Sequence, residues 1–174
     1  GDIVLGLRSS GVHSNGLTLA RKVLFKKWGG RFAFSARPAR FKRSLVEECL
    51  ESTRIYVKPF LKLAKKFEIL GAVHITGDAY LKFEKLMQGK IGFELDNFKP
   101  QPIFNLIQKT GRISDKEMFK TFNMGWGFAL VMHKKDAAQT LALLKKEKIK
   151  AGVIGKVTLA KKIVIKYKNK IIAL

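Results

Sequence analysis

The sequence predicts a single α/β domain. Short apolar runs of strand length alternate along the whole chain with segments whose apolar residues recur at helical spacing. The 174 residues are enough for a sizeable core, and the 47% share of hydrophobic residues argues against a disordered chain. No internal repeat, low-complexity run or linker interrupts the alternation, so residues 1–174 are treated as one domain.

The chain opens with a predicted strand, a polar loop and a helix. The run DIVLGL predicts a buried strand, and the loop SSGVHSNG follows at residues 9–16. The predicted helix has a face of four apolar residues: Leu17, Ala20, Leu24 and Trp28. Gly29 and Gly30 are expected to close this helix, and Ser14 or Asn15 is placed to cap its start.

Residues 31–43 have no regular period and are rich in arginine, which predicts a basic surface loop. SLVEECLEST predicts a short helix. RIYVKP is expected to be extended, because a residue before proline avoids helical geometry. Pro59 then suits the first turn of a helix whose apolar face comprises Phe60, Leu63, Ala64 and Phe67.

The remaining elements follow the same alternation. EILGAVHIT predicts a strand that ends in the turn GDA, and a helix (AYLKFEKLMQG), a strand (KIGFELD) and a helix (PIFNLIQKTG) follow. Ser114 and Glu117 have capping-box spacing at the start of SDKEMFKTF. GFALVMH predicts a strand, DAAQTLALLKKEKI a helix capped by Asp136, and AGVIGKV a strand. KIVIKYKNKIIAL predicts a terminal hairpin around Lys168 and Asn169.

The charge is strongly basic, with 35 Lys and Arg against 13 Asp and Glu and a formal net charge of +22. Such a field attracts polyanions and phosphorylated ligands, so nucleic acid is a legitimate partner class. The lysines are spread along the whole chain, however, as on an ordinary solvated surface. The aromatic residues mostly have core spacing and do not alternate with basic residues as a stacking platform would, so nucleic acid is not favoured.

The location inferred from the sequence is the cytoplasm. Cys49 is the only cysteine and cannot form an internal disulfide, which fits a reducing compartment. The first residues lack the basic and apolar regions of a signal peptide. The uncharged stretches are far shorter than the roughly 18–20 residues that span a bilayer, so no membrane contact is expected.

Four junctions rich in polar residues and glycine stand at predicted strand or helix ends, at residues 9–16, 53–59, 74–79 and 121–127. Glycine there lets backbone amides approach a ligand closely. His13 and His74 could bind a phosphoryl group, carry a proton or orient a substrate. The structural alternatives are a loop histidine with a local hydrogen bond for His13 and a half-buried strand histidine for His74.

Other chemistries find little support in the sequence. No H-x-x-x-H or C-x-x-C spacing suggests a metal site, and neither a P-loop nor a G-x-S-x-G elbow is present. His133 is expected on the surface, and Glu94 with Asp96 at a solvated strand edge. The residues therefore do not form a self-contained catalytic set.

In chain order, five stretches resemble one enzyme family. They are GDIVLGLRSSGVHSNGLTLARKVL, TRIYVKP, HITG, PIFNLIQKTGRISDKEMFKTFNMGWGF and AGVIGKV. Together they resemble the C-terminal half of phosphoribosylformylglycinamidine cyclo-ligase, also called AIR synthase, over roughly residues 1–157. The first loop and HITG also resemble, more loosely, the ATP-dependent relatives in purine, thiamine, selenium and hydrogenase-maturation chemistry, but the stretches at 53–59 and 119–128 favour the cyclo-ligase.

The resemblance implies a three-layer α/β/α domain with a mixed sheet that forms one wall of a groove. The other wall would be an N-terminal domain that carries ATP and magnesium and makes the dimer. The enzyme is an ATP-dependent ligase that forms a C–N bond: it phosphorylates the amide oxygen of formylglycinamidine ribonucleotide, and an internal nitrogen then closes the imidazole ring. By resemblance, the catalytic residues are His13 and His74. The implied substrate-binding residues are Ser10, Ser14, Asn15, Gly16, Thr76, Gly77, Asn123 and Gly125.

The chain departs from the family pattern at three points. Asp78 and Ala79 replace the last two glycines of the family's HITGGG, and an aspartate there would repel a phosphate unless it points away or pairs with a lysine. Ser52 replaces a usual proline. The matched part begins where the family's second half begins, so the chain is expected to bind no cofactor and to be inactive without the N-terminal domain.

One alternative of another class is a stand-alone module for anions or nucleic acid on the same fold. Its best fragment is the basic loop at 31–43, where Phe32, Phe34 and Phe41 lie among arginines.

Overall fold

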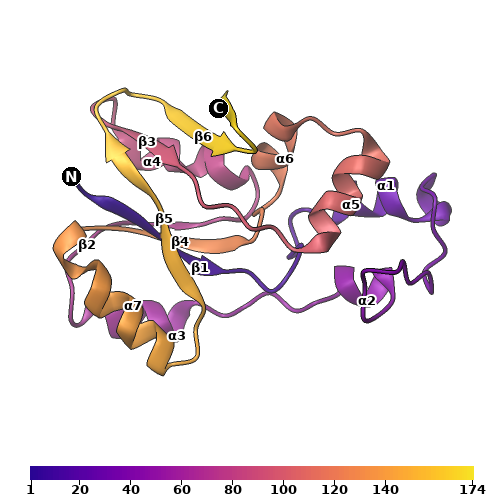
Figure 1. The fold of residues 1–174 in the computed structure, drawn as a ribbon, viewed down its shortest axis with the longest axis horizontal. Helices are drawn as coiled ribbons and strands as arrows, with labels where there is room; N and C mark the ends of the chain where they lie inside the picture. The colour runs from indigo at the N-terminus through magenta and orange to yellow at the C-terminus, as the bar shows by residue number, and fades with distance from the viewer.

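The computed structural model describes residues 1–174 and contains one seven-stranded mixed sheet (Figure 1). The strands lie in the order β2-β4-β1-β5-β3-β6-β7. Their bounds are β1 (Ile3–Arg8), β2 (Ile69–His74), β3 (Gly92–Leu95), β4 (Trp126–Met132), β5 (Ala151–Thr158), β6 (Ile163–Tyr167) and β7 (Lys170–Ala173). Only the β3–β6 pair is parallel. The α/β fold with a mixed sheet is therefore confirmed.

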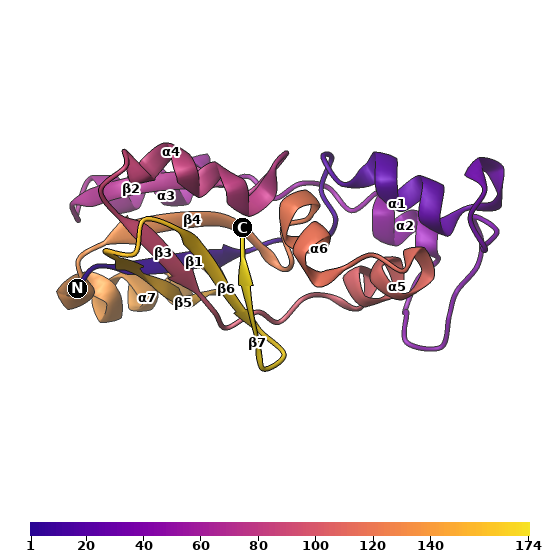
Figure 2. The same cartoon turned by 90° about the horizontal axis from the view of Figure 1, so that it is seen from above.

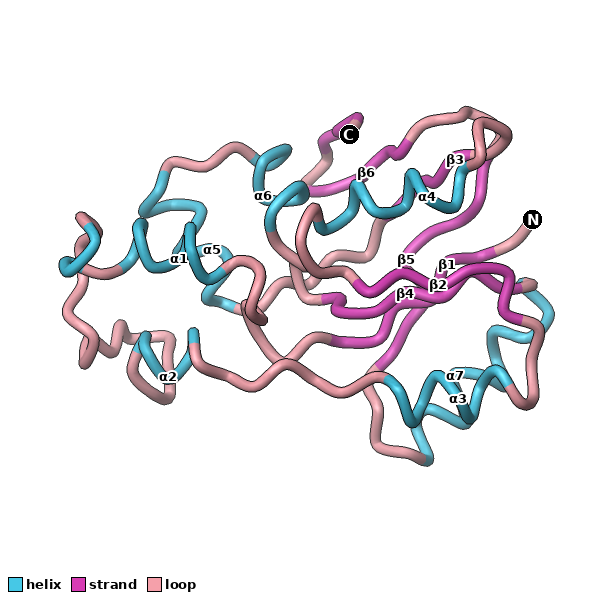
Figure 3. The backbone as a smooth tube through the Cα atoms, turned by 180° about the vertical axis from the view of Figure 1, so that it is seen from behind, coloured by secondary structure: helices cyan, strands magenta, loops and turns pink.

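Two helices, α3 (Val57–Ala64) and α7 (Ala137–Lys146), cover one face of the sheet (Figures 1 and 3). Alternate residues of β1 point toward them, because Ile3, Leu5 and Leu7 share a buried cluster with Leu63 of α3 and Leu144 of α7. This layer supports the strand ends from which the polar loops leave.

The opposite face is covered by the 3₁₀ helix η2 (Ala79–Phe83) and by α4 (Glu84–Met87) and α6 (Asp115–Thr121). Val4 of β1 belongs to this larger cluster, as do Tyr80, Phe83 and Phe119. Tyr80 lies 5.6 Å from Phe119 and Phe83 lies 5.0 Å from Phe93 of β3, centroid to centroid. The two helical layers and the sheet together give the three layers that the resemblance implies.

A group of helices extends beyond the end of the sheet (Figures 1 and 2). It contains α1 (Leu17–Leu24), η1 (Lys26–Trp28), the loop 31–43, α2 (Leu45–Cys49) and α5 (Pro102–Gly111). We call this group the helical lobe. The short 3₁₀ helix η3 (Lys134–Asp136) completes the secondary structure.

The predicted helix at 17–28 is wrong in its last four residues. It ends at Leu24, because Phe25 is extended and its carbonyl accepts the amide of Gly30, while the Lys26 amide bonds to Phe32. The chain therefore folds back on itself, and Trp28, expected on the buried face, is 41% exposed. Within loop 31–43, Phe41 is buried in the core, unlike the surface loop around it.

The helix caps also differ in part from expectation. Neither Ser14 nor Asn15 caps α1, whose N-cap is Gly16, and Asp136 makes no side-chain bond at the start of α7. Ser114 does accept the Glu117 amide. A full capping box occurs instead at α2, between Ser44 and Glu47.

Two further details concern backbone geometry. Val57 and Lys58 are already helical, so the extended segment before Pro59 is two residues shorter than predicted. The terminal hairpin is confirmed: Lys168 and Asn169, with φ of 50° and 60°, form the two-residue turn between β6 and β7. None of the helices is long and apolar enough to span a membrane.

Candidate functional site

The loop at residues 9–16 leaves the end of β1 and is fixed by the turn before β4. The Ser9 amide donates to the Gly125 carbonyl at 3.0 Å, and the Asn123 side-chain amide donates to the Gly11 carbonyl at 2.8 Å. Tyr80 in turn donates to the Asn123 carbonyl at 2.7 Å. Asn123 is buried and its polar atoms are used within the protein, so we interpret it as a positioning residue for the loop.

His13 lies at the turn of this loop with φ of 61°, a left-handed conformation that is uncommon for residues other than glycine. His13 is 3% exposed. The Ser10 amide donates to Nε2 at 3.2 Å, and the Ser10 hydroxyl lies 3.0 Å from the same nitrogen. That hydroxyl donates to the Ser52 carbonyl at 2.6 Å, whereas His13 Nδ1 has no partner. Both Ser10 and His13 are therefore built into the junction between the loop and the segment that precedes α3.

Tyr56 and His13 meet where Gly127 lacks a side chain. A Cβ added at Gly127 would clash with the Tyr56 hydroxyl and would lie 2.9 Å from His13 Cε1. The Tyr56 hydroxyl donates to the Arg8 carbonyl at 3.0 Å. Because Gly127 has no side chain, Tyr56 and His13, which come from distant segments, can both pack against it.

His74 ends β2, which is an edge strand, and its side chain is exposed. Its ring lies 5.7 Å from that of Tyr56, which stacks 5.4 Å from Phe128. These rings border a hollow of about 250 Å³. Its lining consists of Arg54, Ile55, Tyr56, Val57, Phe60, His74 and Phe128. We call it the Tyr56 hollow.

Both histidines are held in the neutral form at neutral pH. Burial lowers the pKa of His13 to about 4, and the nearby His74 and Arg54 add to this shift. Burial and then Lys82 lower the pKa of His74. A neutral imidazole can accept a proton or a hydrogen bond but is a poor electrostatic partner for phosphate. The arrangement therefore favours proton transfer or orientation over charge pairing by these two rings.

A second hollow, of about 510 Å³, joins the first loop to the HITG turn. Its lining consists of Asn15, Gly77, Asp78, Leu81, Glu117, Lys120 and Thr121. Asn15 and Gly77 are close neighbours, since a Cβ at Gly77 would lie 2.9 Å from Asn15 Nδ2. The structure thus brings these two predicted substrate-binding residues together. We call this space the Asn15 hollow.

Asp78 and Ala79 keep the backbone geometry that glycine favours. Both have positive φ, 60° for Asp78 and 38° for Ala79, although neither is a glycine. The Asp78 side chain is exposed at the Asn15 hollow and forms no ion pair. Asp78 and Glu117 therefore give the hollow two carboxylates against one lysine, Lys120.

The other predicted residues have distinct surroundings. The Lys82 ammonium donates to Thr76 Oγ1 at 2.6 Å, so the Thr76 hydroxyl is partly used within the chain. Ser14 is exposed beside Asn15. Gly16 is buried, and a Cβ there would collide with the Phe122 ring at 2.5 Å. Gly125 has φ of 99° and would bring a Cβ within 2.9 Å of Arg8 Nη1.

Sequence reasoning missed Arg8, Arg54, Tyr56, Lys82 and Gly127 as parts of the site. Arg54 and Tyr56 belong to the junction 53–59 and Gly127 to the junction 121–127, so their segments carried a signal. Arg8 precedes the first loop, and its guanidinium lies 4.9 Å from the centre of the Trp126 ring. Lys82 lies in η2, where no sequence pattern marks it.

Several charged groups lie outside both hollows. Glu94 pairs with Lys166 at 2.9 Å and with Lys156 at 3.3 Å. His133 bridges Asp2 at 2.9 Å and Glu68 at 3.3 Å, and these carboxylates raise its pKa.

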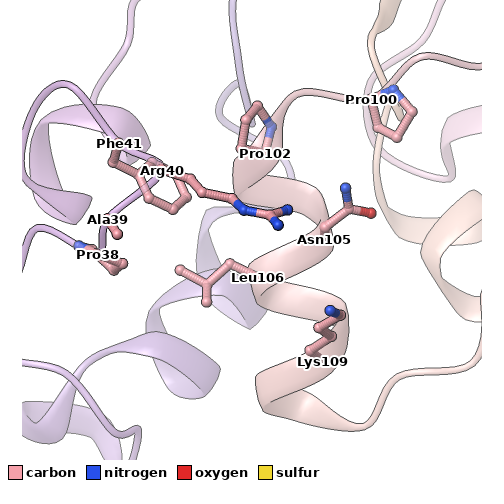
Figure 4. Close-up of a pocket in the computed structure, with 9 residues that line it drawn as sticks. All are labelled: Pro38, Ala39, Arg40, Phe41, Pro100, Pro102, Asn105, Leu106 and Lys109. Carbon is pink, nitrogen blue, oxygen red and sulfur yellow. The ribbon is translucent and has the colours of Figure 1, made fainter.

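A third hollow, of about 290 Å³, lies between loop 31–43 and α5 (Figure 4). No predicted site residue lines it.

Comparison with known proteins gives a consistent family assignment. The family model for AIR synthase related protein, C-terminal domain, matches residues 1–168. The chain is 41% identical over its whole length to a phosphoribosylformylglycinamidine cyclo-ligase from Methanocaldococcus jannaschii, of which the match covers 52%. It is 42% identical to the enzyme of that name from Bacillus cytotoxicus, over 90% of this chain and 45% of the relative.

The fold recurs in solved structures. Hydrogenase maturation protein HypE from E. coli superposes with a TM-score of 0.61 at 17% identity, over 100% of this chain and 49% of that one. This likeness concerns the fold alone. The chain spans about half the length of the curated relatives that it matches. The family match and the two relatives show that the chain belongs to the family of C-terminal domains of AIR synthase related proteins.

Proposed function

We propose that this chain supplies the substrate wall of a phosphoribosylformylglycinamidine cyclo-ligase in purine biosynthesis, acting in the cytoplasm. The reaction would convert formylglycinamidine ribonucleotide and ATP to aminoimidazole ribonucleotide, ADP and phosphate. The observation that carries the proposal is the convergence of two neutral histidines on Tyr56, beside an open hollow that also contains Arg54. The names of the relatives support the reaction class.

The structure supports different roles for the two histidines. His74 is exposed at the Tyr56 hollow, so a substrate can reach its ring. His13 is buried, and its free Nδ1 is closed off from solvent. In this proposal His74 accepts the proton that ring closure releases, while His13 positions the loop and the Tyr56 ring.

The phosphorylated end of the substrate would be held near the first loop. Ser14 and Asn15 are exposed there and offer a hydroxyl and an amide next to Gly77. Arg54, exposed at the Tyr56 hollow, adds a permanent positive charge. Asp78 works against an anion in the Asn15 hollow, because like charges repel at short range.

The Mg²⁺ ion that would accompany ATP in the proposed reaction does not fit this chain's residues alone. No group of three or more His, Cys, Asp or Glu side chains lies close enough together to hold a metal ion. We derive no step through these groups, and the proposal assigns them to the N-terminal half of the enzyme.

The surface beside the Tyr56 hollow is suited to contact the N-terminal half of the enzyme. Ile55 and Val57 line the hollow and are 77% and 61% exposed. Leu61 is also exposed and lies one turn further along α3. Apolar side chains grouped in this way are typical of a protein interface.

The decisive experiment measures ATP-dependent formation of aminoimidazole ribonucleotide by this chain alone and with the N-terminal half of a curated relative. Activity only in the mixture, abolished by His74→Ala, would support the proposal. Activity of the chain alone would contradict the assignment of ATP to the other half. A mixture that binds formylglycinamidine ribonucleotide but is unaffected by His74→Ala would overturn the role of His74.

A further inference from the structure

The helical lobe carries a concentrated positive charge that the proposed reaction does not use. Residues 17–46 contain no aspartate or glutamate. The basic residues of this stretch are Arg21, Lys22, Lys26, Lys27, Arg31, Arg37, Arg40, Lys42 and Arg43. Only Arg43 pairs with carboxylates, those of Glu48 and Glu51. The other charges of this stretch therefore remain available to an anionic partner.

Exposed aromatic rings stand among these charges. Trp28 and Phe34 are each 41% exposed, and their ring centroids are 5.6 Å apart. Phe25 is buried beneath them, 5.0 Å from Phe34 and 6.3 Å from Trp28, and holds both rings in place. The two exposed rings thus form a supported platform at the surface of the lobe.

Two cations accompany the exposed indole. The Arg21 guanidinium lies 5.3 Å from the centre of the Trp28 ring, and the Lys27 ammonium lies 5.5 Å from it. Both side chains are exposed. An aromatic ring next to exposed cations can stack a base while the cations contact the adjoining phosphates.

The third hollow lies in the same lobe and has similar chemistry. Its walls are apolar, with Pro38, Phe41, Pro102 and Leu106 among them, and its polar side chains belong to Arg40, Asn105 and Lys109. Figure 4 shows Arg40 reaching from the loop toward α5, on which Asn105 and Lys109 stand. No carboxylate lines it, so an apolar ring with an attached phosphate would find suitable partners there.

We propose that the helical lobe binds single-stranded nucleic acid, with a base stacked on Trp28 and phosphates on Arg21 and Lys27. A duplex is not favoured, because its bases are already stacked and cannot reach an indole. An anionic membrane would use the charges as well, but the aromatic side chains are anchored to a folded ring cluster and do not form the apolar face of a long amphipathic helix.

The test measures the anisotropy of a labelled oligouridylate of about 12 nucleotides with the intact chain, over a series of salt concentrations. Oligodeoxythymidylate and a duplex of the same length are the comparison probes. We expect binding of the single strands that weakens as salt rises, and weaker binding of the duplex. Trp28→Ala should weaken single-strand binding by about tenfold, and Trp28→Phe by less, because phenylalanine still stacks.

A matched pair of double variants separates local contacts from net charge. Arg21→Gln with Lys27→Gln should lower the salt slope by about 1.4, which is about 0.7 for each phosphate that the variant no longer neutralises. Lys145→Gln with Lys146→Gln removes the same charge from exposed positions of α7 and should have a much smaller effect. Circular dichroism melting checks that each variant is folded.

Three results would overturn the inference. Equal weakening by both double variants would show that the binding depends on net charge alone and not on contacts at Arg21 and Lys27. An unchanged affinity of a folded Trp28→Ala variant would exclude stacking on the indole. Binding to vesicles that contain phosphatidylserine, with none to the oligonucleotides, would assign the lobe to membranes instead.

Discussion

At the scale of single residues, the two histidines show how position decides chemistry. The resemblance implies a catalytic role for both, but His13 is buried behind the first loop and His74 opens onto the Tyr56 hollow. Burial favours the neutral form of each ring, so protonation of His13 should be coupled to unfolding. The protonation state of His13 should therefore affect the stability of the fold, in addition to the part that His13 has in the site.

The first prediction concerns the stability of the protein against pH. Because the pKa of His13 is about 4 when folded and 6.5 ordinarily, the unfolded chain binds its proton first as the pH falls. Its contribution is fully present above the ordinary value and is lost as the pH falls toward about 4. Urea unfolding between these values should show a declining free energy that His13→Asn flattens, since asparagine tolerates positive φ. An equal decline in the variant would refute this.

The second prediction uses a pair of glycines. Gly127→Ala should push the Tyr56 hydroxyl and the His13 ring apart, costing about 1–3 kcal/mol of stability and most of the activity of the complete enzyme. Gly152→Ala is the control, because a Cβ there would meet only ordinary contacts at 3.5 and 3.8 Å. Denaturant unfolding and activity of the mixed halves provide the two readouts. Similar effects at both glycines would show that crowding at Gly127 is not the cause.

The third prediction concerns Asp78 at the Asn15 hollow. Asp78→Gly removes a carboxylate and suits the local φ of 60°, so the backbone of the turn should be kept. Binding of formylglycinamidine ribonucleotide, measured by calorimetry with the mixed halves, should tighten several-fold as repulsion is removed. Lys120→Gln at the same hollow should have the opposite sign. If Asp78→Gly weakened binding, the substrate phosphate would have to lie elsewhere.

At the scale of elements, the short helix α2 depends on its cap. The Ser44 hydroxyl oxygen accepts the Glu47 amide, and the Glu47 carboxylate accepts from the Ser44 amide at 2.8 Å and from its hydroxyl at 2.6 Å, so both ends of the motif are satisfied. The α2 helix has only five residues and cannot be stable by propensity alone. It holds the segment that continues to Ser52, whose carbonyl bonds Ser10.

The fourth prediction follows from this difference between caps. Ser44→Ala should cost about 1 kcal/mol of the free energy of unfolding. Ser14→Ala should change it by only a few tenths of that, because Ser14 caps no helix. Chemical denaturation of both variants measures the contrast directly. A larger loss for Ser14 would mean that the first loop needs its hydroxyl for folding.

Much of the fold can be predicted because periodicity and turn chemistry act locally. The terminal hairpin depends only on its own strands and on Lys168-Asn169, and its prediction is confirmed. The end of α1 is not predictable in this way, because Phe25 leaves the helix to pair with Phe32, and such a pairing cannot be inferred from helical spacing. The caps expected at Asn15 and Asp136 fail for a similar reason, since residue type alone does not set side-chain geometry.

The candidate site can be predicted only by segment. The four junctions do contribute to the region around the two hollows. The placement of His13 and His74 on either side of Tyr56, however, depends on Gly127, which is far from all three residues in the chain. Lys82 is part of the site because η2 folds back toward the end of β2, where the Lys82 ammonium donates to the His74 carbonyl and to Thr76 Oγ1. The assignment of particular ligands to these residues stays a prediction.

At the scale of the whole molecule, the proposed interfaces occupy different parts of the fold. The surface of Ile55, Val57 and Leu61 lies at α3 beside the sheet, whereas Trp28 and Arg40 belong to the helical lobe beyond the end of the sheet (Figure 1). The N-terminal half of the enzyme could therefore bind at α3 without covering the lobe. This separation allows each surface to be tested with the other intact.

The last prediction concerns the surface at α3. Changing Ile55, Val57 and Leu61 together to serine should weaken binding of a relative's N-terminal half by tenfold or more, on the order of 1.4 kcal/mol, because their exposed apolar area would no longer be buried on association. The control changes two strongly exposed residues outside α3 to serine: Leu159, which follows the central strand β5, and Ile171, which lies in the edge strand β7. Sedimentation velocity of each variant with the partner half measures the fraction bound. An interface at α3 requires loss of binding with the first set alone; loss with the control set would place the contact at β5–β7, and the proposal that the Tyr56 hollow faces the other half would be wrong.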